Sequence, residues 1–93
     1  MENFFYRVKN LDTLRSISKK FNIPTTVIIY DNNLTEEISE GDLLYLSRPC
    51  GTPYVVGVLD TLDSIESKFC VKREDILDKN KTPYLIYGEI III

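Results

Sequence analysis

The chain has 93 residues, a formal charge of −3 and a pI near 4.8, with two cysteines and no histidine or tryptophan. This acidic balance gives no electrostatic reason to expect nucleic acid or an anionic membrane as a partner. Without histidine, catalytic triads and Cys/His zinc sites are excluded, and we expect no catalytic residues, metal or cofactor. The length allows one ordinary domain or two very small ones.

Neither end of the sequence carries a targeting or membrane signal. The N-terminus lacks a basic segment followed by an apolar stretch, so we expect no signal peptide. The longest aliphatic run, residues 90–93, is far too short to cross a bilayer, so we expect no membrane insertion. These features predict synthesis in the cytoplasm. Cys50 and Cys70 are expected to be free thiols, although the sequence leaves their redox state open.

The first half predicts a strand, two helices and a second strand. Residues 6–9 form a short β-type run, followed by Asp12-Thr13, either of which is suited to cap a helix. Spacings of three and four predict one buried helix face, formed by Leu14, Ile17 and Phe21. Asn22 stands where a left-handed C-cap is expected. A second helix with two inward aliphatic residues, a polar loop, a glycine turn and an aliphatic strand follow, at Ile28, Ile29, Gly41 and residues 43–46.

The second half repeats the first at an offset of 48 residues. Positions 6–33 and 54–81 share 12 identities in 28 aligned residues, and beyond Asn80 the offset falls to 47. The sequence therefore predicts two modules, residues 1–47 and 54–93, joined by a short Pro/Gly connector, residues 48–53. Cys70 takes the place of Asn22 in the second module, where a left-handed backbone would strain it.

The last strand places isoleucine on both faces, whereas alternation would leave one face in water. Either the two modules pack on one another, or another protein covers this strand. The second possibility includes a protein partner or self-association through Ile90 and Ile92.

This order of residues, met twice, resembles the LysM domain. The positions that carry the resemblance are Tyr6, Val8, Asp12, Thr13, Leu14, Ile17, Phe21, Ile28, Ile29, Asn32, Ile38, Gly41, Leu44 and Leu46, and again Tyr54, Val56, Asp60, Thr61, Leu62, Ile65, Phe69, Ile76, Leu77, Asn80, Leu85, Gly88, Ile91 and Ile93. The resemblance implies an α+β fold of two βααβ modules, each with two helices on a two-stranded antiparallel sheet. It also implies noncatalytic binding of N-acetylglucosamine glycans, either peptidoglycan or chitin-type chains.

Carried over by position, the resemblance implies two shallow glycan-binding grooves. The first wall would be Leu11, Asp12, Thr13 and Leu14 in one module and Leu59, Asp60, Thr61 and Leu62 in the other. The opposite walls would be Asn33, Leu34 and Ile38, and Thr82, Tyr84 and Leu85. The family usually has glycine where this chain has Leu11 and Leu59, so either leucine is expected to narrow or fill its groove.

An alternative function stays open, in which the fold serves protein interaction or assembly, as in spore coats or in phage-tail and contractile-injection baseplates. The leucine substitutions and the hydrophobic last strand favour it, while the tandem pattern favours glycan. The corresponding location is a spore, phage or injection particle, or the cell wall if the chain is part of a longer protein. A hydrolase built on Asp12 and Asp60 is disfavoured, because each aspartate is expected to cap a helix in its own repeat.

Overall fold

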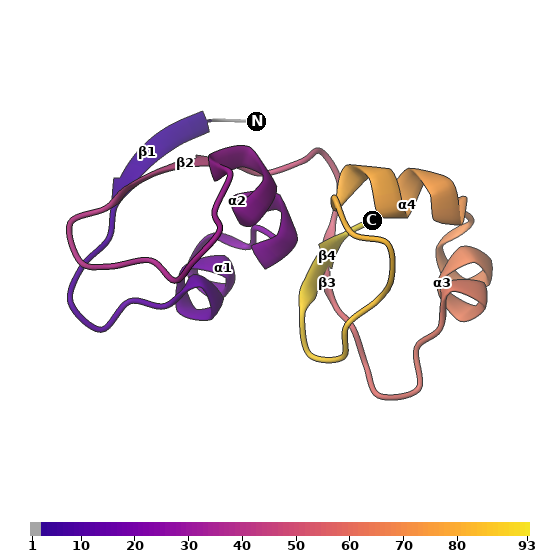
Figure 1. Cartoon of the computed structure of the whole chain (residues 1–93). Helices are drawn as coiled ribbons and strands as arrows, with labels where there is room; N and C mark the ends of the chain where they lie inside the picture. Colours follow the sequence, from indigo (N-terminus) through magenta and orange to yellow (C-terminus); the bar gives the residue numbers. More distant parts are fainter. Residues whose placement is uncertain (1–2) are drawn as a thin grey trace.

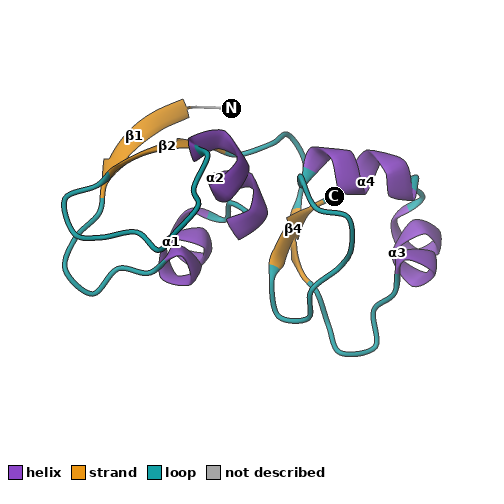
Figure 2. Cartoon of the chain, in the orientation of Figure 1, coloured by secondary structure: helices purple, strands orange, loops and turns teal. Residues whose placement is uncertain are grey.

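The computed structural model describes residues 3–93, which form two βααβ units in sequence (Figure 1). The N-terminal unit contains β1 (Asn3–Arg7), α1 (Leu14–Phe21), α2 (Thr25–Asn32) and β2 (Leu43–Ser47). The C-terminal unit contains β3 (Pro53–Val55), α3 (Leu62–Phe69), α4 (Arg73–Lys79) and β4 (Ile90–Ile92). Each unit has one antiparallel two-stranded sheet, β1–β2 or β3–β4 (Figure 2). The expected α+β class is therefore confirmed.

Each unit has its own small hydrophobic core. In the N-terminal unit the buried residues come from the residue after β1, from both helices and the turn between them, and from β2: Val8, Ile17, Ile23, Val27, Ile28, Leu44 and Leu46. In the C-terminal unit they are Val56, Ile65, Ile76 and Ile91. The pairing of Ile28 with Ile29 as inward residues is wrong, because Ile29 is exposed and Val27 is buried in its place.

The starts of α1 and α3 are capped by threonine and not by aspartate. The hydroxyl of Thr13 accepts a hydrogen bond from the Ser16 amide, and the Ser16 hydroxyl accepts one from the Thr13 amide. Thr61 and Ser64 form the same capping box at α3. The helix ends also agree, since Asn22 and Cys70 both adopt the expected left-handed conformation, with φ of 56°.

An asparagine ties the second helix of each unit to its last strand. The Asn32 side chain accepts from the Tyr45 amide at 2.8 Å and donates to the Tyr45 carbonyl at 2.9 Å. Asn80 makes the same pair of bonds with Ile92, at 2.7 and 2.9 Å. In each case the side chain satisfies one residue of a strand edge that would otherwise lack a partner. This explains why asparagine recurs at the end of the second helix of both units.

The connector between the units belongs partly to the second sheet. Thr52 and Ile93 exchange two backbone hydrogen bonds of 2.9 Å, which extend the β3–β4 ladder by one pair. Gly51 has φ of 138°, and a Cβ atom there would lie 2.3 Å from the Ile93 carbonyl oxygen. Only glycine fits this approach, so the connector is held against the C-terminal strand.

Candidate functional site

A groove in the N-terminal unit lies between the start of α1 and the loop before β2. It has a volume of about 270 Å³ and is lined by Asp12, Thr13, Leu14, Arg15, Glu37 and Ile38. The expected walls thus meet in part, with residues 12–14 and Ile38 around one hollow. Arg15 and Glu37 were not expected, although each is the immediate neighbour of an expected residue.

Three expected residues of this site lie elsewhere. Leu11 is 90% exposed and does not line the groove, so the expectation that it fills the site is wrong. Asn33 ends α2 in a left-handed conformation, with φ of 52°. Leu34 is half-buried and packs against the N-terminal core. Fewer of the expected residues therefore line the groove, and the groove is open to solvent.

A tyrosine–aspartate contact fixes the loop that forms the first wall. The Tyr6 hydroxyl donates to Asp12 Oδ2 at 2.6 Å, and the Lys9 amide donates to the same oxygen at 2.8 Å. These hydrogen bonds, that from Tyr6 foremost, lower the pKa of Asp12, while the bond to Asp12 raises the pKa of Tyr6. The expected capping role of Asp12 is corrected, since its carboxylate braces the turn before the helix.

The same brace recurs in the C-terminal unit. Tyr54 donates to Asp60 Oδ2 at 2.6 Å, as does the Gly57 amide, and the pKa values of Asp60 and Tyr54 shift in the same directions and for the same leading cause. In both units the tyrosine ring packs edge-on against a phenylalanine at 5.1–5.3 Å, Phe21 or Phe69. Tyr6 and Tyr54 are thus structural braces.

The residues expected to line a C-terminal groove lie in separate places and do not surround one hollow. Leu59 is 88% exposed, Thr61 caps α3, and Leu62 is half-buried. Leu85 packs against the C-terminal core. The Thr82 hydroxyl, in contrast, donates to the Tyr84 carbonyl at 2.8 Å, and both residues line a pocket shared with α2 of the other unit.

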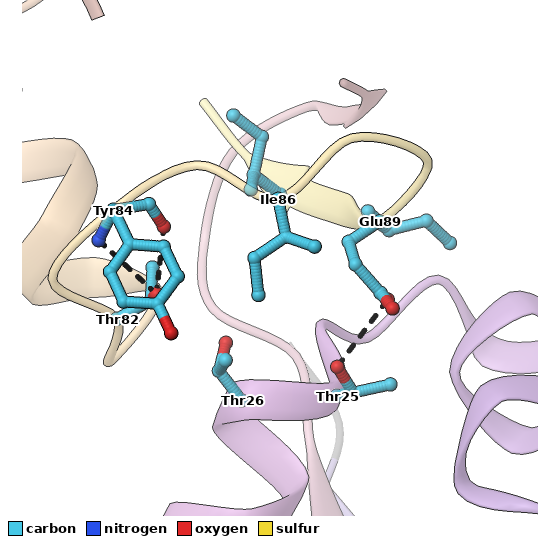
Figure 3. A pocket seen from close by; sticks show the side chains of 8 residues that line it. Thr25, Thr26, Thr82, Tyr84, Ile86 and Glu89 are labelled. Carbon is cyan, nitrogen blue, oxygen red and sulfur yellow. Dashed lines mark hydrogen bonds between the residues drawn. The ribbon is translucent and has the colours of Figure 1, made fainter. Parts of the chain in front are cut away.

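That pocket is the junction between the units, and Figure 3 shows it from close by. It is lined by Thr25, Thr26, Thr82, Tyr84, Ile86, Glu89, Ile90 and Ile91, and its volume of about 10 Å³ holds roughly one water molecule. Thr26 donates to the Asn80 carbonyl at 2.6 Å, and Thr25 donates to the Glu89 carboxylate at 3.4 Å. Since α2 has no side-chain cap of its own, Glu89 supplies a favourable negative charge at its start.

Packing between the units also covers the last strand. Ile91 lies in the C-terminal core, whereas Ile90 faces the junction with α2. Ile90 is 6% exposed and Ile92 is fully buried, so neither forms a free surface. The expectation of a partner or of self-association through these two residues is therefore corrected, because the chain covers them itself.

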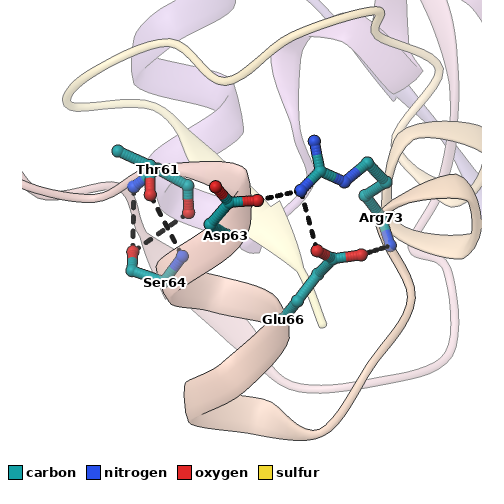
Figure 4. Close-up of polar contacts among 5 residues, drawn as sticks. All are labelled: Thr61, Asp63, Ser64, Glu66 and Arg73. Carbon is teal, nitrogen blue, oxygen red and sulfur yellow. Dashed lines mark hydrogen bonds and ion pairs between the residues drawn. The ribbon is translucent and has the colours of Figure 1, made fainter.

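An ion pair joins the two helices of the C-terminal unit (Figure 4). The Arg73 guanidinium contacts the carboxylates of Glu66, at 2.8 Å, and of Asp63. The Arg73 amide also donates to Glu66 at 2.9 Å, so the Glu66 carboxylate of α3 binds both the backbone and the side chain of Arg73, the first residue of α4. Hydrogen bonds from the Arg73 side chain and backbone lower the pKa of Glu66.

Comparison with known proteins supports the assignment of the N-terminal unit. Residues 6–46 match the LysM domain family. The LysM match spans β1 to β2 and includes every residue that lines the groove. A comparison with curated proteins finds no match.

Two solved structures are similar over nearly the whole chain. One is the spore cortex-lytic enzyme SleL of Bacillus megaterium QM B1551, at 29% identity and a TM-score of 0.47 over 96% of this chain. The other is the spore cortex-lytic enzyme SleL of Bacillus cereus, at 21% identity and a TM-score of 0.48 over 100% of this chain. The chain spans 22% of the length of each enzyme.

Two further properties concern the whole described chain. Between residues 3 and 93, none of the helices combines the length and apolar character needed to cross a membrane. Within the same residues, no three acidic, cysteine or histidine side chains are grouped to hold a metal ion. Cys50 and Cys70 are both exposed and unpaired with each other.

Proposed function

We propose that the protein is a noncatalytic binder of glycans that contain N-acetylglucosamine, and that the groove of the LysM domain is a binding site. The observation that carries this proposal is the coincidence of the family match with an open groove between residues 12–15 and 37–38. The ligand class is peptidoglycan or a chitin-type chain, which places the protein at a cell wall.

The groove has the chemistry that an acetamido sugar requires. Leu14 and Ile38 offer aliphatic surface for the acetamide methyl group and the apolar face of a pyranose ring. Thr13, Arg15 and Glu37 add polar groups at the rim, where sugar hydroxyls form hydrogen bonds. Because the exposed Leu11 side chain does not occupy the hollow, the leucine in place of the family glycine leaves the site open.

The C-terminal unit is proposed as a second LysM module. It shares with the first the capping box, the tyrosine–aspartate brace and the asparagine bridge to the last strand. The contacts of α2 with Asn80 and Glu89 fix the position of this unit beside the first.

Titration followed by NMR tests the proposal. Chitin oligomers at millimolar concentration are expected to shift the amide signals of residues 12–15 and 37–38. Glu37→Ala should weaken binding of these neutral oligomers, whereas Glu36→Ala removes the same charge from a neighbouring residue outside the groove and should not. Absence of any shift with chitin oligomers and with peptidoglycan fragments would refute the proposal. Incubation with purified peptidoglycan should release no soluble fragments, because the proposed activity is binding alone.

The alternative function in assembly loses its main structural support. It depended on a hydrophobic last strand in need of a covering partner, and β4 is covered by the chain's own core and by α2. We therefore place glycan binding first.

A further inference from the structure

We propose that Arg15 makes the LysM groove prefer N-acetylglucosamine glycans that carry a carboxylate over neutral ones. This inference rests on the proposed function, because it concerns the same groove. It names the substrate class that the sequence left open between peptidoglycan and chitin-type chains.

Arg15 offers a cation at the edge of the groove without a partner of its own. It follows Leu14 in the first turn of α1, and its side chain is exposed and lines the hollow. Within residues 3–93, no carboxylate oxygen lies within 4.0 Å of its guanidinium. A guanidinium presents donors in a planar fork that matches the two oxygens of a carboxylate.

The C-terminal unit borders this guanidinium without blocking it. A Cβ atom placed on Gly88 would lie 3.3 Å from Nη2 of Arg15, so the turn before β4 passes close to the side chain. Because residue 88 is glycine, no side chain of that residue fills the space beside the cation. Arg15 therefore stands where the groove of one unit meets a turn of the other.

The acidic residues of the groove give a bound carboxylate one favoured direction. Asp12 Oδ2 already accepts hydrogen bonds from Tyr6 and Lys9 and belongs to the turn. Glu37 lies in the opposite wall and repels a ligand carboxylate. Attraction to Arg15 and repulsion from Glu37 together orient a carboxylated sugar toward the junction.

The C-terminal unit lacks this device. Its residue equivalent to Arg15 is Asp63, which has the opposite charge and contacts Arg73. The charge preference is thus a property of the N-terminal groove alone, and it distinguishes the two repeats.

Three tetrasaccharide ligands test the inference and locate the carboxylate. They are neutral N-acetylchitotetraose, a GlcNAc–MurNAc tetrasaccharide with free lactyl carboxylates, and the same glycan with stem peptides. We expect about fivefold tighter binding of at least one carboxylated ligand at low salt, with the preference shrinking as salt is added. The ligand that shows the preference identifies the lactyl group or the peptide as the source.

Matched variants separate Arg15 from general charge. Arg15→Gln should abolish the preference, so that all three ligands bind with equal affinity, whatever it costs in binding of N-acetylchitotetraose through the lost polar group at the rim. Lys19→Gln removes the same charge from an exposed residue of the same helix outside the groove, and should retain the preference. Equal affinity of the unaltered protein for all three ligands would overturn the inference and leave the proposed function standing. Binding of none of them would overturn the proposed function itself.

Discussion

The two units share one set of braces but join their helices differently. At three equivalent positions the C-terminal unit has Asp63, Glu66 and Arg73, which form an ion-paired contact between α3 and α4. The N-terminal unit has Arg15, Ser18 and Thr25. Ser18 is 1% exposed, and its hydroxyl has no hydrogen-bond partner among residues 3–93.

This difference indicates a division of roles between the repeats. Arg73 forms ion pairs inside its own unit, whereas Thr25 contacts Glu89 of the other unit. Arg15 lines the groove and has no ion-pair partner among residues 3–93. The hydrogen bonds that both units share, tyrosine to aspartate and asparagine to the last strand, maintain the fold of each unit. The positions that differ determine how the copies meet each other and what surface charge each one presents.

The largest expected effect tests whether the asparagine bridges are equivalent. Asn80→Ala would leave the buried amide and carbonyl of Ile92 unsatisfied, and we expect a loss of about 3 kcal/mol in unfolding free energy. Asn32→Ala should cost less, about 1–2 kcal/mol, because that asparagine is only half-buried and water reaches Tyr45 more easily. Urea unfolding measures both, and equal losses would contradict the difference in burial.

A matched pair of glycine substitutions should have opposite signs. Leu11 has φ of 71°, a left-handed conformation, whereas the backbone of Leu59 does not enter that region. Leu11→Gly should therefore stabilise the fold by about 1 kcal/mol, since it relieves the strain. Leu59→Gly should destabilise it by roughly 0.5–1 kcal/mol through added freedom of the unfolded chain. Thermal unfolding of the two variants checks the signs, and a shift in the same direction would refute the explanation.

The differing contacts between the helices predict that substitutions at two equivalent positions, Ser18 and Glu66, change stability in opposite directions. Ser18→Ala removes a buried hydroxyl without a partner and should raise stability by about 1 kcal/mol. Glu66→Ala removes a carboxylate bound to Arg73 and should lower stability, by less than a buried ion pair would because solvent screens this one. Denaturant titration at low and high salt separates them, because only the effect of Glu66→Ala should depend on salt.

The smallest expected effect concerns acid, where the two units should behave alike. Hydrogen bonds from Tyr6 and Tyr54 lower the folded-state pKa of Asp12 and Asp60, so each carboxylate stabilises the fold above its unfolded pKa of about 4. That contribution is lost as pH falls through the lower folded value. Tyr6→Phe and Tyr54→Phe should each flatten the stability profile below pH ~4. Unfolding curves from pH 2 to 6 test this, and an unaltered slope in either variant would rule out the brace as the cause.

Local features were predictable where a single residue type determines the geometry. The helix at Leu14 follows from spacing and a capping threonine, and the left-handed ends at Asn22 and Cys70 follow from helix length. The choice between Asp12 and Thr13 as the cap could not be made, because both side chains suit the role and only the position of Tyr6 assigns the aspartate elsewhere.

The groove was predictable in its first wall and less so in its second. Residues 12–14 adjoin a helix start, so their place is set locally. Glu37 and Ile38 lie in a long polar loop whose path depends on packing across the unit. The positions of Thr82 and Tyr84 also depend on long-range packing, because these residues lie at the junction, where they neighbour residues of the other unit.

By itself, the sequence predicted two similar halves, the βααβ order in each and a last strand covered on both faces. These conclusions depend on periodicity and repeated residues, which act over short distances along the chain. Only the tertiary structure decided what covers that strand, because the hydrogen bond between Thr25 of α2 and Glu89 beside β4 joins residues 64 positions apart. It likewise decided that Asp63 is paired with Arg73 while its counterpart Arg15 has no ion-pair partner in the part of the chain that the structure describes, since that depends on which charges folding brings together.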